Sequence, residues 1–397
     1  MGIRRRGAAG SLVSVVLAAI PASGQSAPAT NAAGISSLTP ITIYRDSKRY
    51  NSFPDVTRLP DGRLLCVFRD ATFPKQIRHI EADARVVGCV SEDQGRTWSK
   101  PEVIYDDPAC QNDPSVAVLK DGRLLLTFFN WVGRSAEYAA AHKTHQSRKV
   151  DRGPWGEYAE PGGVYLLWGR ARDLKWDKEA THVAGDAAVL RGTSAAVLET
   201  RKGTLLMPIY GRSEERRVKN RRRDVGAVLR SVDGGKTWGN EIVIAEDPGR
   251  TIDMGEPALA QAANGDIVAL LRTANAEDHL FITRSADDGM TWSTIAQTGL
   301  IGHPAALQLL PDGRLLIVYG YRHAPFGVRG CISMDDGKTW YPSKVFTIAA
   351  TGVQTDLGYP SVCLTNDNHA VVAYYMNGRD TKDRWIECKR IPLSSLE

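Results

Sequence analysis

An eight-residue phrase with the pattern S-x-D-x-G-x-T-W occurs four times and constrains the fold of this chain more than any other feature. The copies begin at Ser91, Ser231, Ser285 and Ser333. Each copy joins two strand-like segments. Asp, Ser and Thr side chains cap the amides of a tight turn, Gly accepts a positive φ, and Trp packs onto neighbouring strands. The phrase therefore predicts a hairpin turn, and a single Asp per turn supplies too few oxygens for a calcium loop.

A weaker phrase centred on Gly is interleaved with the first and predicts an inner hairpin each time. Its six copies start at residues 59, 119, 200, 262, 310 and 365. The mean spacing of about 61 residues suits a four-stranded unit with loops, so the sequence predicts an all-β, six-bladed propeller over residues 39–397. Residues 41–44 are expected to pair with residues 385–391 and close the ring. The second interval is the longest, which predicts an insertion and a rim loop at residues 138–186.

Composition excludes disordered, collagen-like and multi-span membrane proteins. The chain has 397 residues, of which 43% are hydrophobic and 24% charged, as in soluble globular proteins. The net charge of +5 is too small to indicate nucleic-acid binding, although anionic ligands stay possible.

The N-terminus has the pattern of a secretory signal at residues 1–24, with a basic start, a short apolar stretch and small residues for cleavage. Residues 25–38 have the composition of a linker. No segment reaches transmembrane length. We therefore expect an exported protein, secreted or periplasmic, that acts as a monomer.

Export permits disulfides, but the six cysteines show no CxxC spacing and no zinc pattern. They are Cys66, Cys89, Cys110, Cys331, Cys363 and Cys388. Four of them lie inside apolar strand-like runs, which favours buried thiols over catalytic ones. We expect neither a metal nor an organic cofactor.

With these repeats the sequence resembles the sialidase superfamily, whose Asp box is the S-x-D-x-G-x-T-W phrase. The resemblance covers roughly residues 40–395 and implies a central site built from the ends of inner strands. It implies a glycoside hydrolase, although relatives include trans-sialidases, lyases and non-catalytic members. In the family three arginines hold the substrate carboxylate, a Tyr paired with a Glu is the nucleophile, and an Asp is the acid/base.

The best local match to this machinery lies in the second half of the chain. Glu256 resembles the family Glu in Met254-Gly255-Glu256-Pro257, and Arg272 matches the second arginine after it. Tyr359, before Pro360, resembles the nucleophile.

The other arginines of the clamp match less well. Ser52-Phe53-Pro54 stands where the family has Arg-Ile-Pro, so the first arginine is absent, and Arg69 is a candidate substitute. Arg322 and Arg329 compete for the third position.

Three residues compete for the role of acid/base, namely Asp70, His79 and Asp83. His79 is a candidate in its own right because the pKa of imidazole lies near neutrality. Asp113, before Pro114, and His303, before Pro304, open inner strands and are expected to contact substrate.

The leading hypothesis is an exported, exo-acting sialidase-like hydrolase that removes a terminal anionic sugar from a glycan. A lyase for uronate polymers, or a glycosidase for a different sugar, is the alternative that uses His and Tyr in the same pocket. A non-catalytic glycan-binding propeller is the third hypothesis.

Overall fold

The computed structural model describes residues 32–73, 79–143, 147–153, 156–187, 189–212, 217–218, 221–274, 276–379 and 384–396. The predicted signal at residues 1–24 lies outside this part. Strands dominate the described residues, and none of the described helices is long and apolar enough to cross a membrane. The short helices are η1 (Ala32–Ser37), α1 (Ala136–Ala141), η3 (Pro342–Lys344) and η4 (Leu393–Leu396).

The strands form antiparallel groups in chain order. The first group is β2 (Arg49–Arg58), β3 (Leu64–Thr72), β4 (Arg85–Ser91) and β5 (Glu102–Tyr105). The second is β6 (Cys110–Val118), β7 (Arg123–Arg134), β9 (Gly156–Arg170) and β10 (Lys175–Trp176), with β8 (Arg148–Gly153) and β11 (Thr181–Ala184) paired to β9. The third is β12 (Leu190–Gly192), β13 (Leu198–Glu199), β14 (Leu205–Arg212), β17 (Val225–Ser231) and β18 (Ile242–Ala245), beside the hairpin β15 (Arg217–Val218) and β16 (Arg221–Arg222).

The C-terminal half is more regular. It contains one sheet of β19 (Asp253–Gln261), β20 (Ile267–Ala274), β21 (His279–Ser285) and β22 (Ala296–Ile301). The next is β23 (Ala305–Leu309), β24 (Leu315–Tyr321), β25 (Phe326–Ser333) and β26 (Phe346–Gly352). The last group is β27 (Gly358–Leu364), β28 (His369–Asn377), β29 (Arg384–Pro392) and the N-terminal β1 (Ile41–Arg45).

The all-β, propeller-like arrangement is confirmed, but hydrogen bonding does not divide the described residues into six separate four-stranded blades. The last group joins the first through one parallel pair, Tyr50 with Arg384, and makes an eight-stranded sheet. The insertion adds β8 and β11 to the second sheet, which has six strands. The number of separate sheets therefore differs from the number of sequence repeats, because strand ends and added segments also pair.

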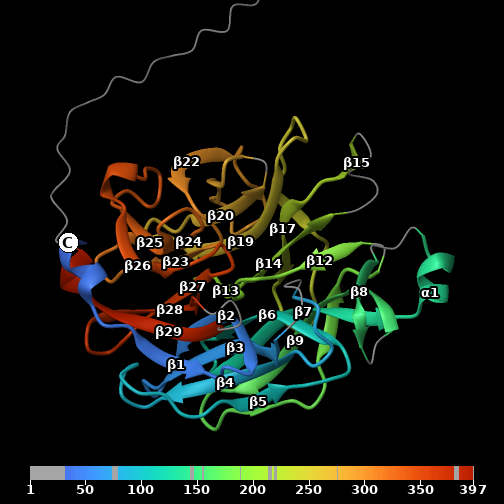
Figure 1. Ribbon diagram of the computed structural model, residues 1–397. Coiled ribbons are helices and arrows are strands. Elements are labelled where there is room, and N and C mark those ends of the chain that lie inside the picture. Colours follow the sequence, from blue (N-terminus) through green and yellow to red (C-terminus); the bar gives the residue numbers. More distant parts are fainter. Residues whose placement is uncertain are drawn as a thin grey trace, which may run out of the picture.

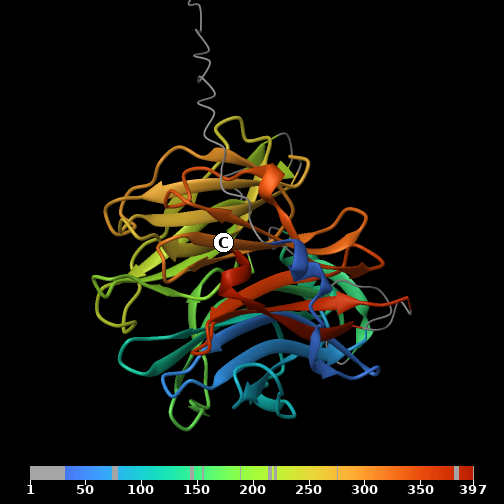
Figure 2. The ribbon, with the colours of Figure 1, turned by 90° about the vertical axis from the view of Figure 1, so that its left-hand side faces the viewer.

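The sheets surround a common centre, where the first strand of each group lies (Figure 1). β2 contacts β27 and β6, β19 contacts β14 and β23, and β23 contacts β27. The predicted closure by residues 41–44 is confirmed, because β1 pairs with β29 from Ile41–Cys388 to Arg45–Trp385. The two ends of the described chain also meet, since η1 contacts η4 (Figure 2).

The hydrophobic core lies between neighbouring sheets rather than at the centre. In β3, Leu64, Cys66 and Phe68 pack toward the last group, whereas Leu65 and Val67 pack toward the second. Successive side chains of a strand point to opposite faces, and both faces of this strand are covered. This geometry explains the continuous apolar runs in the second strands of the groups.

The four copies of the repeated phrase form the predicted hairpin turns. In the first, the Ser91 hydroxyl donates to Asp93 Oδ1 (2.9 Å) and accepts from the Gly95 amide (2.7 Å). Thr97 donates to Asp93 through its amide (2.8 Å) and its hydroxyl (2.7 Å). The other three turns repeat these bonds. The turns are therefore structural, as predicted.

Two predicted boundaries need correction. Within residues 138–186, residues 156–170 are no loop but the third strand of the second sheet, in register with β7. Residues 32–38 belong to the packed domain rather than to the linker. Ile35 is buried against the last two groups, and Lys389 Nζ donates to the Ser36 carbonyl (2.8 Å).

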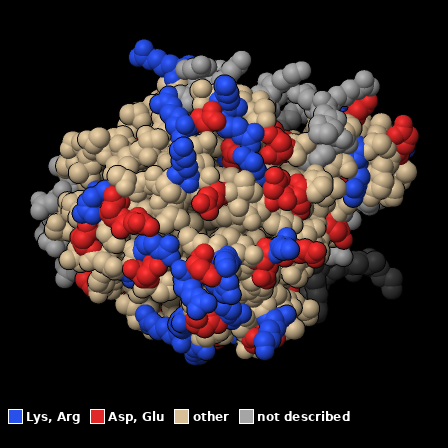
Figure 3. Space-filling model, turned by 90° about the horizontal axis from the view of Figure 1, so that it is seen from below, with Lys and Arg blue, Asp and Glu red and all other residues tan. Residues whose placement is uncertain are grey.

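The cysteine prediction is confirmed, because all six cysteines are buried as free thiols. Surface charge follows no single sign on the face seen from below, where basic and acidic side chains lie side by side (Figure 3).

Candidate active site

Four inner strands share a local distortion that brings their side chains to one place. Phe53, Asp113, Glu256 and Tyr359 each precede a proline and have φ between 45° and 55°. The strand register shifts at each of them, as in a β-bulge. Residues other than Gly with positive φ are strained, and such strain clusters at functional sites.

All four bulge residues line one cavity of about 350 Å³. The ends of second strands complete its wall with Phe129, Tyr210 and Arg272. Trp131 and Arg148 line it as well. Distant stretches of chain thus meet in one hollow, as the sequence predicts.

A triangle of polar side chains forms the centre of this candidate site. Tyr359 Oη donates to Glu256 Oε1 (2.8 Å). Arg272 Nη1 donates to both Glu256 oxygens (2.8 and 3.0 Å) and to Tyr359 Oη (3.1 Å). The Glu256 side chain is 8% exposed and that of Arg272 is 27% exposed, so the guanidinium is accessible from the cavity.

Burial favours the protonated forms of Tyr359 and Asp113. Burial and the negative charge of Glu256 raise the pKa of Tyr359 well above its ordinary value, although Arg272 opposes this. The pKa of Asp113 is raised well above its ordinary value by burial and by Glu256. The cavity therefore holds a phenol beside the Glu256 side chain, and a second carboxyl group, Asp113, whose protonated form burial favours.

His79 also lines the cavity, with its ring 5.0 Å from that of Phe53. Its Nε2 lies 3.7 Å from Asp356 Oδ1. Burial lowers the pKa of His79 to about 4, and the nearby arginines act in the same direction while Asp356 opposes them. His79 is therefore a neutral imidazole at neutral pH.

Comparison with known proteins assigns the chain to a family. A family model described as a BNR repeat-like domain matches residues 166–372, just over half of the chain. The chain belongs to the BNR repeat-like family. No curated protein matches this BNR-repeat protein.

Solved structures show the sialidase-like fold of the BNR-repeat protein. A protein of unknown function from Dyadobacter fermentans is 27% identical, over 88% of this chain and 97% of its own, with a TM-score of 0.76. The leech intramolecular trans-sialidase is 14% identical, over 90% of this chain and 71% of its own, with a TM-score of 0.63. The intramolecular trans-sialidase of Ruminococcus gnavus is 13% identical, over 91% and 98%, with a TM-score of 0.64. The predicted resemblance to the sialidase superfamily is confirmed at the level of fold.

Arg69 and Asp70, both predicted for the site of the BNR-repeat protein, lie outside the cavity wall. Arg69 is fully buried and pairs with Glu81. Asp70 accepts hydrogen bonds from Arg49 (2.9 Å) and Arg85 (3.0 Å), which makes it a structural ion-pair centre. These contacts argue against clamp and acid/base roles for the two residues.

Asp83 also lies outside the cavity wall. It accepts hydrogen bonds from the Thr72 amide (3.0 Å) and from Arg49 (2.9 Å) at the protein surface. The reason is shared with Asp70, because one arginine, Arg49, pairs with both carboxylates.

The structure separates the two arginines that compete for the third clamp position. Arg329 stacks on the Tyr321 ring (3.3 Å to the centroid), away from the cavity. Arg322 lies behind the nucleophile candidate, 5.5 Å from the centre of the Tyr359 ring, and donates to the Leu357 carbonyl (3.2 Å). Arg272 is thus the one arginine of the predicted clamp in the described cavity wall.

His303 does not line the cavity, contrary to its predicted contact with substrate. It is buried, and its Nε2 lies 3.1 Å from Asp278 Oδ1. Burial lowers the pKa of His303 to about 2, with Arg272 and Arg322 acting in the same direction. Among the described residues, no cluster of His, Cys, Asp and Glu has the arrangement of a metal site.

The sequence did not indicate Tyr210 and Phe129 as wall residues of the cavity, although their strand register places them there. Arg272 pairs with Gly255, the residue before the bulge at Glu256. Phe129 pairs with Asn112, and Tyr210 pairs with Gly192 at the equivalent places. The second-strand residue opposite the bulge thus faces the cavity in several groups.

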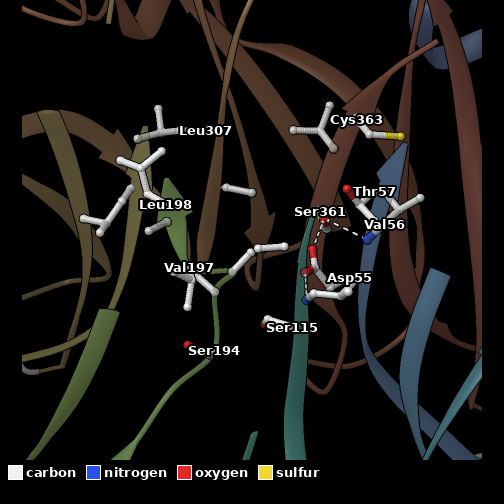
Figure 4. A pocket seen from close by; sticks show the side chains of 18 of the residues that line it. Asp55, Val56, Thr57, Ser115, Ser194, Val197, Leu198, Leu307, Ser361 and Cys363 are labelled. Atoms are coloured by element: carbon white, nitrogen blue, oxygen red, sulfur yellow. Dashed lines mark hydrogen bonds between the residues drawn. The ribbon is translucent and has the colours of Figure 1, made fainter. Parts of the chain in front are cut away.

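A second cavity of about 420 Å³ lies beside the first and shares Phe53, Asp113 and Tyr359 as wall residues. Asp55 lies in its wall, where it accepts hydrogen bonds from the Ser361 hydroxyl and from the Val116 amide (2.6 Å) (Figure 4). Burial raises the pKa of Asp55 to about 6. These bonds connect β2, β6 and β27, so Asp55 holds the bulged strands in place.

Proposed function

We propose that this BNR-repeat protein is a glycoside hydrolase of sialidase-like type that removes a terminal, anionic sugar from a glycan. The observation that carries the proposal is the triangle of Tyr359, Glu256 and Arg272. It lies in a cavity within the volume range of small-ligand sites. A tyrosine that donates to a buried carboxylate has the geometry of an activated nucleophile.

The first chemical step follows from this geometry. Tyr359 Oη attacks the anomeric carbon while its proton passes to Glu256, which lies at hydrogen-bonding distance (2.8 Å). The bond to the leaving-group oxygen breaks, and that oxygen takes a proton from an acid. Water then attacks the anomeric carbon and its proton goes to the deprotonated acid. The bond between that carbon and Tyr359 Oη breaks, and Tyr359 Oη takes back its proton from Glu256. Arg272 stabilises the negative charge that moves between Glu256 and Tyr359.

Asp113 is the acid that the site supports best. It lines the cavity, and burial together with the negative charge of Glu256 raises its pKa, which favours the protonated form that an acid needs. His79 is neutral at that pH and donates a proton less readily. Asp113 thereby takes the role for which the sequence suggested Asp70, His79 or Asp83.

An anionic sugar fits the accessible guanidinium of Arg272. Structures of two neighbours contain 2,7-anhydro-Neu5Ac and oseltamivir carboxylate, which supports a carboxylate-bearing ligand. Phe53 takes the place of an arginine, and its ring lies 4.6 Å from that of Tyr359. We infer that the carboxylate is held by fewer arginines than in the predicted clamp.

The proposed site implies six repeated units, the blades of a propeller, around one central axis. The eight-stranded sheet supports this count, because it consists of two four-stranded groups that share the pair Tyr50–Arg384. Hydrophobic clusters also fill six interfaces between successive groups around the ring of described residues. The predicted signal at residues 1–24 leads us to propose that the enzyme acts after export.

A uronate lyase is the second candidate, and His79 is the observation that favours it. A neutral imidazole beside Phe53 and Tyr359 suits abstraction of the proton alpha to a carboxylate that Arg272 neutralises. Elimination leaves a carbon–carbon double bond that absorbs ultraviolet light, whereas hydrolysis does not.

The test is a screen for sugars released from sialylated, uronate-containing and neutral glycans, with ultraviolet absorbance recorded in parallel. We expect release of an acidic monosaccharide without new absorbance, and loss of release in Arg272→Ala. New absorbance would establish the lyase instead. Binding without turnover of any glycan would support the non-catalytic alternative, and equal release of neutral sugars by wild type and Arg272→Ala would contradict the anionic substrate.

A further inference from the structure

Arg148 lines the cavity but does not belong to an inner strand. It begins β8, which pairs with β9 beyond the edge of the inner hairpin. Its guanidinium lies 4.7 Å from the centre of the Trp131 ring, and both residues belong to the cavity wall. Trp131 is almost fully buried, so it offers Arg148 a rigid surface. Stacking of this kind fixes the guanidinium plane without neutralising its charge.

The other two arginines of the described cavity wall are neutralised by carboxylates. Arg272 pairs with Glu256, and Arg212 donates to Asp224 through two nitrogens (2.6 and 2.8 Å). Arg148 contacts no carboxylate among the described residues and is exposed at the surface of the cavity. Partial burial and the like charge of Arg212 lower the pKa of Arg148, while Tyr210 and Asp224 oppose them. The N–H donors of Arg148 are therefore available to a ligand that brings a negative charge.

Arg148 and the catalytic triangle line the same cavity and share one electrostatic neighbour, Tyr210. Arg212, Tyr210 and Asp224 are the charged or titratable neighbours of Arg148. Glu256, Asp113 and Tyr359 are neighbours of Tyr210 as well. Arg148 therefore presents its positive charge in the same cavity as the triangle, beside different charged groups.

We propose that Arg148, stacked on Trp131, binds a carboxylate or sulfate group on the sugar unit next to the one that Tyr359 attacks. The substrate is then an acidic oligosaccharide with negative charge on its second unit as well. The inference rests on the proposed function for the place of the first sugar. A planar guanidinium forms two parallel hydrogen bonds with either oxyanion, so both sources of the charge satisfy the same site.

The experiment measures binding by calorimetry in Tyr359→Phe, which separates recognition from turnover. The probes are a glucuronate-containing tetrasaccharide, its carboxyl-reduced neutral counterpart and a sulfated oligosaccharide of the same length. We expect an acidic probe to bind at least about tenfold tighter than the neutral one. Adding Arg148→Ala should remove this preference and leave neutral binding unchanged, whereas Arg148→Lys should keep part of it because the charge remains but the planar fork is lost.

Lys149→Ala is the matched control, because it removes the same charge from the neighbouring exposed residue that does not line the cavity. It should retain the full preference. Equal affinities of the Arg148→Ala and parent proteins for both acidic probes would overturn the inference, even if the wild type releases sugars. An Arg148-dependent preference without turnover in the wild type would support the inference and refute the proposed hydrolase.

Discussion

The Asp-box turns and the bulges of the inner strands are both repeated features, but the turns repeat their side chains whereas the bulges repeat only their backbone. The four turns keep both backbone and side chains, down to the same bonds from Ser and Thr to Asp. The bulges keep the backbone, with φ near 50°, but carry Phe53, Asp113, Glu256 and Tyr359. Identical side chains in the turns stabilise the sheets that contain them, and different side chains in the bulges line one cavity.

This comparison teaches where to look for function in a repeat protein. A feature that recurs with its side chains intact fills the same structural role in every unit. A feature that recurs only as a backbone distortion delivers a different side chain to the centre each time. The largest functional effects are therefore expected at the bulges, and effects on stability alone at the turns.

The sharpest test of the comparison is Tyr359→Phe, which removes one hydroxyl from a bulge. Because the nucleophile is lost, kcat should fall by roughly 10³-fold or more on the sugar identified by the screen. The melting temperature should stay within a few degrees of the wild type. Tyr341→Phe, the same change at an exposed residue, is the control and should keep full activity. Wild-type kcat in Tyr359→Phe would exclude the proposed nucleophile.

The second test is Asp113→Asn, which removes the proposed acid from another bulge. We expect kcat/KM to fall by about 10²-fold for substrates with poor leaving groups and far less for an activated aryl glycoside, which needs no protonation. Wild-type kcat/KM should decline as the pH rises through the raised pKa of Asp113, and the variant should lack that decline. An equal loss for both leaving groups would assign Asp113 to substrate binding rather than to proton transfer.

The same group makes a prediction on stability. Because the folded protein binds the Asp113 proton more tightly than the unfolded chain, its contribution is complete at low pH. The free energy of unfolding should therefore decrease as the pH rises through the folded pKa, and less so in Asp113→Asn. Urea unfolding of both proteins over a pH series measures the difference.

The third test addresses the turns. Asp335→Asn weakens the bonds from Ser333 and Thr339, and we expect a loss of about 1 kcal/mol in the free energy of unfolding with kcat unchanged. The hydrogen bonds lower the pKa of Asp335 against the opposing effect of burial, so its contribution is present above the unfolded pKa and fades as the pH falls through the folded one. Denaturant unfolding at neutral and acidic pH measures both. A strong loss of kcat in a fully folded variant would show that the turns do more than stabilise.

The smallest effect is expected for Arg329→Ala. Arg329 stacks on Tyr321 outside the cavity wall, so kcat/KM should change by less than about twofold. A larger decrease, measured with an acidic substrate, would restore Arg329 to the carboxylate clamp.

The sequence predicts much of the fold because its repeats specify local turns. The S-x-D-x-G-x-T-W phrase contains every donor and acceptor of its turn, so no distant residue is needed to form it. The pairing of β1 with β29 was also predictable, since a strand must close the ring. The count of separate blades was not, because the pair Tyr50–Arg384 depends on how two strand ends approach one another.

The candidate site was predictable at Glu256 and Tyr359, because each residue precedes a proline in a phrase that resembles one of the family. Asp70 and Asp83 were equally suitable candidates in the sequence, but in the structure both pair with Arg49 and neither lines the cavity. Arg148 left no signal, because the pairing of β8 with β9 brings it to a cavity made by other segments.

By itself the sequence determined the turns, the strand pairs and the kinds of side chain available for chemistry, since these depend on residues a few positions apart. Only the tertiary structure decided which charged groups are neutralised by a neighbour and which face the cavity. Burial and ion pairing are set by contacts between distant segments, and these contacts distinguish Arg69, paired with Glu81, from Arg148, which stacks on Trp131 in the cavity wall.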